Sequence, residues 1–172
     1  CDRNQLSSLD VSQNTALTDL VCGWNQLTSL DLNQNTDLYA LGCSYNQLTG
    51  LDVSNNTTLA WLDVKHNQLS TLDISNNAAL INLHCSYNQL TGLDLSQNTA
   101  LTDIYCSNNQ LTGLDMSQCA ALFMFMADSN QLSCLNLKNG NFQNLYFFTC
   151  SGNPGLSCIE VDDVTMATQK FS

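Results

Sequence analysis

Basic residues are scarce in this chain. Only four of its 172 residues are Lys or Arg, against fifteen Asp and Glu, so the formal net charge is −11. Nucleic acids and anionic membranes are bound chiefly through Lys and Arg. The charge balance therefore argues against both as partners, and it suits a soluble protein outside the cell or on its surface, or one that meets cations.

Proline and long apolar runs are scarce as well. Proline occurs once, at Pro154, and no apolar stretch reaches the length that crosses a bilayer, so we expect no membrane insertion. The chain starts at Cys1, without Met or a signal peptide, and ends at Ser172 without a clear stop. We therefore expect a fragment of a longer protein that is secreted or displayed on a cell surface.

What the sequence does contain is a 21-residue repeat. Each unit holds two near-copies of one pattern, as in Leu80-x-x-Leu83-x-Cys85-x-x-Asn88-x-Leu90 followed by Leu90-x-x-Leu93-x-Leu95-x-x-Asn98. Apolar residues at period two predict strands, and the Asn, Ser, Thr and Gly between them predict turns. Two Asn columns keep the period: Asn4, Asn25, Asn46, Asn67, Asn88, Asn109 and Asn130, then Asn14, Asn35, Asn56, Asn77 and Asn98.

This pattern predicts a mainly β solenoid with little or no helix, in which every coil carries two short strands on opposite walls. Equal register would stack the strands as two parallel sheets about 4.8 Å apart, over about eight coils. We place the solenoid at 1–161 and the start of a C-terminal cap at 162–172. The predicted repeats are 14–34, 35–55, 56–76, 77–97, 98–118, 119–139 and an irregular last one at 140–163, where a two-residue insertion separates Leu122 from Leu145 by more than one period.

The motif Leu-x-x-Leu-x-Leu/Cys-x-x-Asn-x-Leu resembles the leucine-rich-repeat signature. Its nested 21-residue form, over roughly residues 4–161, is similar to the IRREKO class of bacterial leucine-rich repeats, which includes internalin-like proteins. The resemblance implies a right-handed solenoid. It also implies a secreted or surface-anchored protein whose function is protein interaction or adhesion.

Most of the recurring polar and sulfur-containing residues have a structural interpretation. The Asn columns are expected to satisfy backbone groups inside the corners of the coils. Val64 and Ala127 share the column of Cys22, Cys43 and Cys85, so that position requires a small apolar side chain, and buried thiols are favoured over a zinc site. The equivalent positions of Cys134 and Cys158 on neighbouring coils predict a disulfide between them.

A column of carboxylates should point outward from the second sheet. We expect these side chains to accept hydrogen bonds from turn N–H groups or from neighbouring Ser and Thr. The alternative is a row that binds calcium, which prefers carboxylate ligands; no other cofactor is expected. The row would comprise Asp31, Asp52, Asp73, Asp94 and Asp115.

The outward side of the first sheet varies from coil to coil, whereas the second wall is nearly constant. Exposed aromatic rows with polar neighbours are typical of interfaces and of sugar-stacking platforms, although the rings could also simply stack and shield the edge of the core. Asp63 and His84 should lie side by side, but a shallow face with no nucleophile argues for an ion pair and against a catalytic site. The candidate binding residues are Trp24, Tyr45, Trp61, His66, His84, Tyr87 and Tyr105.

The leading hypothesis is a non-enzymatic scaffold that binds a protein partner through the first sheet. A carbohydrate-binding module on the same face is the second hypothesis, and a passive spacer is the third. Ice binding is a fourth, disfavoured because the Thr columns alternate with Ser beside carboxylates. Unpaired strands at the solenoid ends also allow end-to-end self-association.

Overall fold

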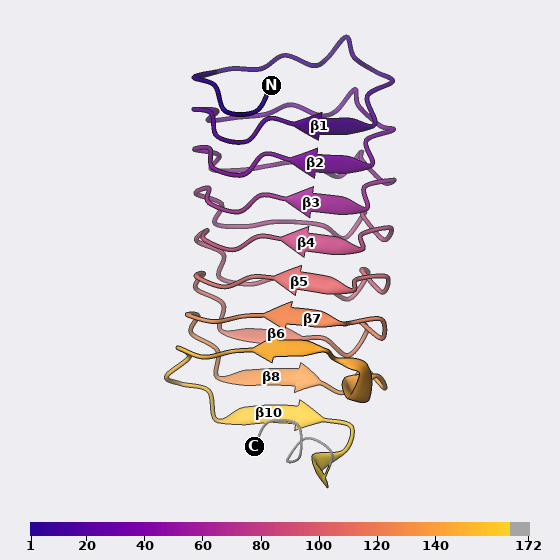
Figure 1. Ribbon diagram of the computed structural model, residues 1–172, viewed down its shortest axis with the longest axis vertical. Coiled ribbons are helices and arrows are strands. Elements are labelled where there is room, and N and C mark those ends of the chain that lie inside the picture. The colour runs from indigo at the N-terminus through magenta and orange to yellow at the C-terminus, as the bar shows by residue number, and fades with distance from the viewer. Residues whose placement is uncertain (166–172) are drawn as a thin grey trace.

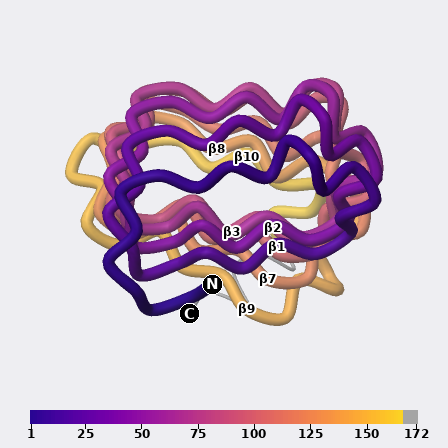
Figure 2. The backbone as a smooth tube through the Cα atoms, turned by 90° about the horizontal axis from the view of Figure 1, so that it is seen from above, coloured from indigo at the N-terminus to yellow at the C-terminus, as the bar shows by residue number. Residues whose placement is uncertain are grey.

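The computed structural model describes residues 1–165. The chain winds into a solenoid of stacked coils, with the N-terminus at one end of the stack and β10 at the other (Figure 1). Seen along the stack, each coil is a flattened ring with two opposite walls (Figure 2). The predicted solenoid is therefore confirmed, while most of the cap expected at 162–172 lies outside the described residues.

The first sheet is formed by one wall and is parallel throughout. Partners lie one full repeat apart from β1 to β7, as in Leu20 with Leu41, whereas the step from β7 to β9, where Phe125 pairs with Phe148, is longer because of the insertion. The sheet thus has seven coils with strands, one fewer than the expected eight. Its strands are β1 (Asp19–Val21), β2 (Ala40–Gly42), β3 (Trp61–Asp63), β4 (Asn82–His84), β5 (Asp103–Tyr105), β7 (Met124–Met126) and β9 (Phe147–Thr149).

The second sheet is shorter than the sequence predicts. It contains only β6 (Gly113–Asp115), β8 (Cys134–Leu137) and β10 (Cys158–Val161). In earlier coils this wall forms no strand ladder, so the prediction that every coil carries two strands was wrong. There the coils are joined at the corner before this wall, where Gln47 N–H donates to the Leu27 carbonyl at 2.9 Å, and the wall itself is held by its buried leucines.

The space between the walls is filled by columns of identical apolar side chains. Leu41, Leu62 and Leu83 of the first sheet are fully buried. Cys43 and Cys85, which follow the strand leucine of their coil by two residues, are fully buried as well. Each coil buries this surface only against its neighbours, so stability is approximately a sum of contacts between adjacent coils. Each fully buried leucine contributes about 2 kcal/mol to that sum.

The first Asn column ties each corner to the next coil. Asn88 is 9% exposed; its Oδ1 accepts the Leu69 N–H at 3.0 Å, while its Nδ2 donates to the carbonyls of Val64 and Cys85 at 3.0 and 3.1 Å. Asn25, Asn46, Asn67, Asn109 and Asn130 repeat this arrangement. The predicted structural role of this column is confirmed.

The irregular last coil accommodates its two extra residues in a short 3-10 helix, η1 (Phe142–Asn144), between β8 and β9. Beyond it, Cys158 of β10 pairs in register with Cys134 of β8, with the Cα atoms 4.5 Å apart, and a disulfide joins the two side chains. This bond links the last coil to the one before it.

Candidate functional site

Four of the predicted binding residues form one continuous stack of rings. The ring centroids are 3.8 Å apart for Trp24 and Tyr45, 4.1 Å for Tyr45 and His66, and 4.1 Å for His66 and Tyr87, with planes within 16° of parallel. Trp24 and Tyr87, at the two ends, are 49% and 50% exposed, whereas the two inner rings are half-buried. We call these four residues the stacked column.

The backbone of the stacked column adopts the left-handed conformation. This region is uncommon for bulky residues, yet the corner that leads into each buried Asn requires it in every coil. Glycine takes the same place in the last coil, at Gly152 with φ 70°. The positive φ angles of the non-glycine residues lie between 50° and 57°, at Arg3, Trp24, Tyr45, His66, Tyr87, Asn108 and Ser129.

The other three predicted residues lie on the strands themselves. The ring of Trp61 leans over Gly42, where an added Cβ would come within 3.2 Å of it. His84 is 6.4 Å from the Trp61 ring and packs edge-on against Tyr105 at 4.2 Å, centroid to centroid. All seven predicted residues therefore belong to the outer side of the first sheet, in two neighbouring groups.

The sequence suggested an ion pair between Asp63 and His84. In the structure, Asp63 pairs with Lys65 instead. The Lys65 ammonium lies 3.4 Å from the Asp63 carboxylate, which is almost buried and also accepts the Lys65 N–H at 3.2 Å. Burial lowers the pKa of His84, and Lys65 lowers it further, against the opposing effect of Asp63. A neutral imidazole beside an already paired carboxylate explains the absence of a His84 ion pair among the described residues.

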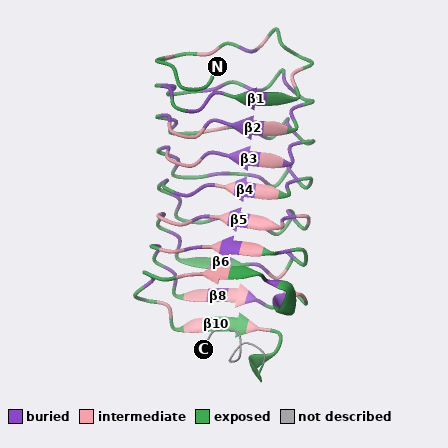
Figure 3. Ribbon diagram, in the orientation of Figure 1, coloured by how far each residue is buried: buried purple, intermediate pink, exposed green. Residues whose placement is uncertain are grey.

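The sequence interpretation missed an apolar patch on the last two coils of this sheet. It comprises Phe123, Met124, Met126, Tyr146 and Phe147. The exposed fractions of Phe123, Tyr146 and Phe147 are 46%, 73% and 41%, and β9 is coloured partly as exposed and partly as intermediate (Figure 3). The available signal was the run of apolar residues from Phe123 to Met126, which is too long for a strand with one buried face.

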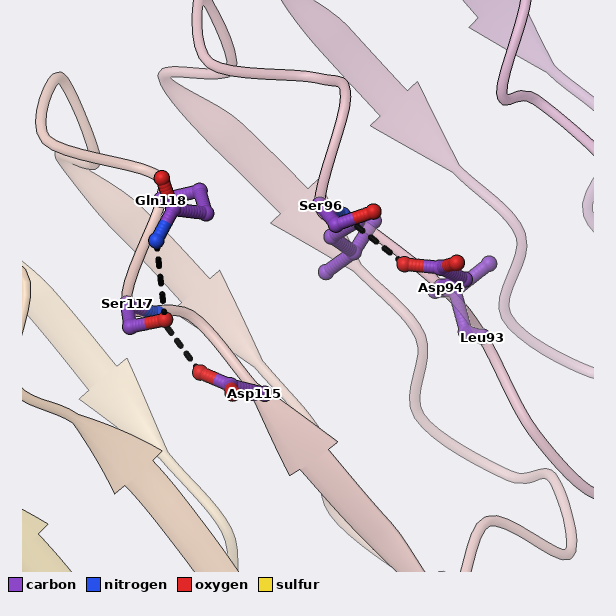
Figure 4. A pocket seen from close by; sticks show the side chains of 7 residues that line it. Leu93, Asp94, Ser96, Asp115, Ser117 and Gln118 are labelled. Carbon is purple, nitrogen blue, oxygen red and sulfur yellow. Dashed lines mark hydrogen bonds between the residues drawn. The ribbon is translucent and has the colours of Figure 1, made fainter.

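The outward Asp column makes the hydrogen bonds expected of it. Asp94 Oδ1 accepts the Ser96 N–H at 2.9 Å, and Asp115 Oδ1 accepts the Ser117 N–H at 2.8 Å. These two carboxylates and the two serines line a shallow cleft between adjacent coils (Figure 4). Bonds from Ser96 lower the pKa of Asp94. The N–H and hydroxyl donors of the turns are thus sufficient to stabilise this row of carboxylates without a metal ion.

Burial limits the reactivity of the core cysteines among the described residues. Burial raises the pKa of Cys22 to about 11 and that of Cys85 to about 12, which keeps both thiols protonated and poor as nucleophiles or metal ligands. Among residues 1–165, only Cys134, Cys158 and Glu160 lie close enough together for a metal. Two of these are joined in the disulfide. No helix in that range has the length and apolarity to cross a membrane.

Comparison with known proteins agrees with the fold and the repeat. No family model and no curated protein matches the sequence. Among solved structures, the functional domain of InlJ from Listeria monocytogenes, which includes a cysteine ladder, is 35% identical with a TM-score of 0.75. The match covers 94% of this chain and 38% of that one, so this chain spans about two fifths of the InlJ domain.

Two further structures share the fold at lower identity. The internalin InlF from Listeria monocytogenes is 22% identical, with a TM-score of 0.76 over 90% of this chain and 57% of InlF. A leucine-rich-repeat protein of Leptospira interrogans is 23% identical, with a TM-score of 0.78 over 98% of this chain and 51% of that protein. The chain is thus an internalin-like leucine-rich-repeat solenoid.

Proposed function

We propose that this internalin-like chain is a non-enzymatic scaffold of a secreted or cell-surface bacterial protein, and that it binds a protein partner through the outer face of the first sheet. The observation that carries the proposal is a constant framework that holds variable aromatic side chains outward. The Leu, Cys and Asn columns fix the backbone, while Trp61, His84 and Tyr105 occupy outward positions where other coils have unrelated residues.

Rigid, amphipathic rings are favourable binding groups because they bury a large area at a low cost in side-chain entropy. The stacked column holds Tyr45 and His66 between two rings and Trp24 and Tyr87 against one, so little side-chain entropy remains to be lost on binding. A shallow face of this kind fits the extended surface of a protein better than a small substrate, which needs an enclosing pocket.

The ring geometry also favours a protein over a glycan. Sugars stack on the open faces of aromatic rings, but the faces of Tyr45 and His66 are covered by their neighbours in the stack. What these two inner rings offer to solvent is their edges with hydroxyl and N–H groups, which suit hydrogen bonds to a peptide backbone, and only the end rings Trp24 and Tyr87 keep one unstacked face each.

A selection from a random-peptide library, run beside a glycan array, tests the proposal. We expect peptides to be enriched on the chain, and Trp61→Ser or Tyr105→Ser to weaken their binding by about tenfold or more. Thr91→Ala on the opposite wall is the matched control and should change nothing, with thermal unfolding recorded for all variants. Binding of glycans alone would instead assign the face to carbohydrate recognition. If neither peptides nor glycans bind, the proposal is wrong and the chain is better described as a passive spacer.

A further inference from the structure

We propose that the partner docks on the apolar patch of the last two coils, and that it is a cationic protein segment with an apolar anchor between Lys or Arg side chains. This inference rests on the proposed function. It adds the centre of the interface and the chemistry of the partner.

The patch is contiguous and built from large side chains. Phe123 and Tyr146 stack with centroids 5.1 Å apart and planes 7° from parallel, and Met124 is in register with Phe147 on the neighbouring strand. Soluble domains rarely expose neighbouring aromatic and methionine side chains without a binding role. Methionine adapts its shape to an incoming side chain, which suits an anchor pocket.

Exposed apolar residues elsewhere on the same edge of the sheet are isolated. Tyr39 occupies the position equivalent to Phe123 and is 53% exposed, but its neighbours in the column are Thr18 and Ala60. Ile81 likewise lies between Ala60 and Thr102. Single exposed apolar residues are normal on protein surfaces, so the last two coils stand apart in this respect.

Two carboxylates, those of Asp103 and Asp128, lie beside the patch. Asp103 is in register with Met124, and it accepts the hydroxyl of Thr102. Asp128 follows β7, and it accepts the Ser151 N–H and hydroxyl, both at 2.7 Å. Among residues 1–165, every donor to these two carboxylates is an uncharged group, which orients their negative charges without neutralising them.

The three basic residues that the structure describes are engaged elsewhere. Within residues 1–165, Arg3 pairs with Asp2, Lys65 with Asp63 and Lys138 with Glu160, at 3.6, 3.4 and 2.7 Å. A partner that covers the patch would therefore meet two unneutralised carboxylates on a molecule of net charge −11. Lys or Arg on either side of an apolar anchor supplies the missing charge.

The same observations disfavour the other occupants. A second copy of the chain would bring identical carboxylates together on two surfaces of the same sign, which is repulsive. An anionic lipid surface would be repelled by the same charges. The stacking of Phe123 on Tyr146 covers one face of each ring, so a glycan would find less open ring face than two separate aromatic side chains offer.

The peptides selected on the chain provide the test. We expect enriched sequences to carry an aromatic or aliphatic residue flanked by Lys or Arg, and their affinity to fall as salt rises. Tyr146→Ser and Phe147→Ser should each weaken binding by about tenfold, and Asp103→Asn should weaken it and reduce its salt dependence. Tyr39→Ser changes an exposed aromatic on the same edge, with an exposed fraction between those of Tyr146 and Phe147, and is the matched control that should bind like the wild type.

Each contrary result overturns the inference in a recognisable way. Selected peptides without basic residues, or peptides whose binding survives Phe147→Ser but not Trp61→Ser, would leave the protein-binding function intact and move its centre away from the patch. A dimer of the free chain in light scattering that Phe147→Ser abolishes would assign the patch to a second copy. Enrichment of no peptide at all would remove the proposed function as well.

Discussion

Two asparagines that look alike in the sequence differ in how completely they are bonded. The Oδ1 of Asn88 accepts a backbone N–H, whereas the buried Oδ1 of Asn77 has no partner among residues 1–165, although its Nδ2 donates to the carbonyls of Val53 and Asn56 at 3.0 and 2.8 Å. An unsatisfied buried acceptor costs about 1–3 kcal/mol. Part of the stability that the hydrogen bonds of Asn77 contribute is therefore offset by the cost of its unpaired Oδ1.

Alanine at these two positions should have unequal effects. Asn88→Ala leaves the Leu69 N–H unpaired, whereas the carbonyls of Val64 and Cys85 still accept from Asn67 and Asn109. We therefore expect a loss of about 2 kcal/mol, against about 1 kcal/mol for Asn77→Ala, which also removes the unpaired oxygen. Urea unfolding of both variants measures the difference. Cys119 already replaces Asn in the second column and stays fully buried, which agrees with the smaller loss; equal losses would contradict it.

The histidines on the first sheet should make stability depend on pH. Burial lowers the pKa of His66 and His84 from 6.5, so folding favours the neutral ring. Their contribution is present above pH 6.5 and is lost as pH falls through that value toward the lower pKa of the folded state. We expect the melting temperature to drop between pH 7 and 5, and His84→Gln to reduce that drop; an unchanged pH profile in this variant would exclude His84 as a cause.

Among the elements, the last coil depends most on a covalent link. The disulfide between Cys134 and Cys158 closes a segment with a sequence separation of 24 residues that contains η1 and β9. Constraining a loop of this length in the unfolded chain contributes about 3 kcal/mol. The remaining described cysteines are free, and those inside the core are buried.

Reduction should therefore destabilise this end of the solenoid. We expect a strong reductant to lower the unfolding free energy by up to about 3 kcal/mol, and hydrogen exchange to rise first in β9 and β10. A variant with both Cys134→Ala and Cys158→Ala should not respond to reductant. An equal response in that variant would trace the effect to another sulfur.

The repeat explains which elements were predictable. The inward leucines gave the first sheet and its register, because an offset of one whole repeat permits only one parallel pairing. The left-handed corner could not be anticipated from Trp24 or Tyr87, since neither residue favours that conformation and the surrounding coil imposes it. The second sheet was overestimated because period-two leucines indicate burial on a wall but do not guarantee hydrogen bonds between coils.

The candidate site was predictable only where the repeat is regular. The stacked column follows the 21-residue period and was recognised by its spacing. Tyr146 and Phe147 come after the two-residue insertion, so they fall outside the counted columns. Their alignment with Phe123 and Met124 became visible only through the strand register.

For the whole molecule, the charge of −11 should make stability respond to salt. Screening weakens repulsion between like charges, so NaCl should raise the melting temperature. Calcium chloride at equal ionic strength should give a similar rise, because turn N–H groups already occupy one oxygen of each carboxylate in the Asp column, including Asp52 and Asp73. A larger, saturating shift with calcium, lost in Asp73→Asn, would show that the row binds the ion.

The constant register has a consequence for how such a chain can change over time. Recombination between two units of equal length would add or remove a whole coil and would leave every surviving residue in its column. Loss of 77–97, for example, would place Asp63 beside Tyr105 and would end the ring stack at His66. Genetic shuffling could thus change the outer surface of the first sheet in a single event, while the interior is inherited unaltered.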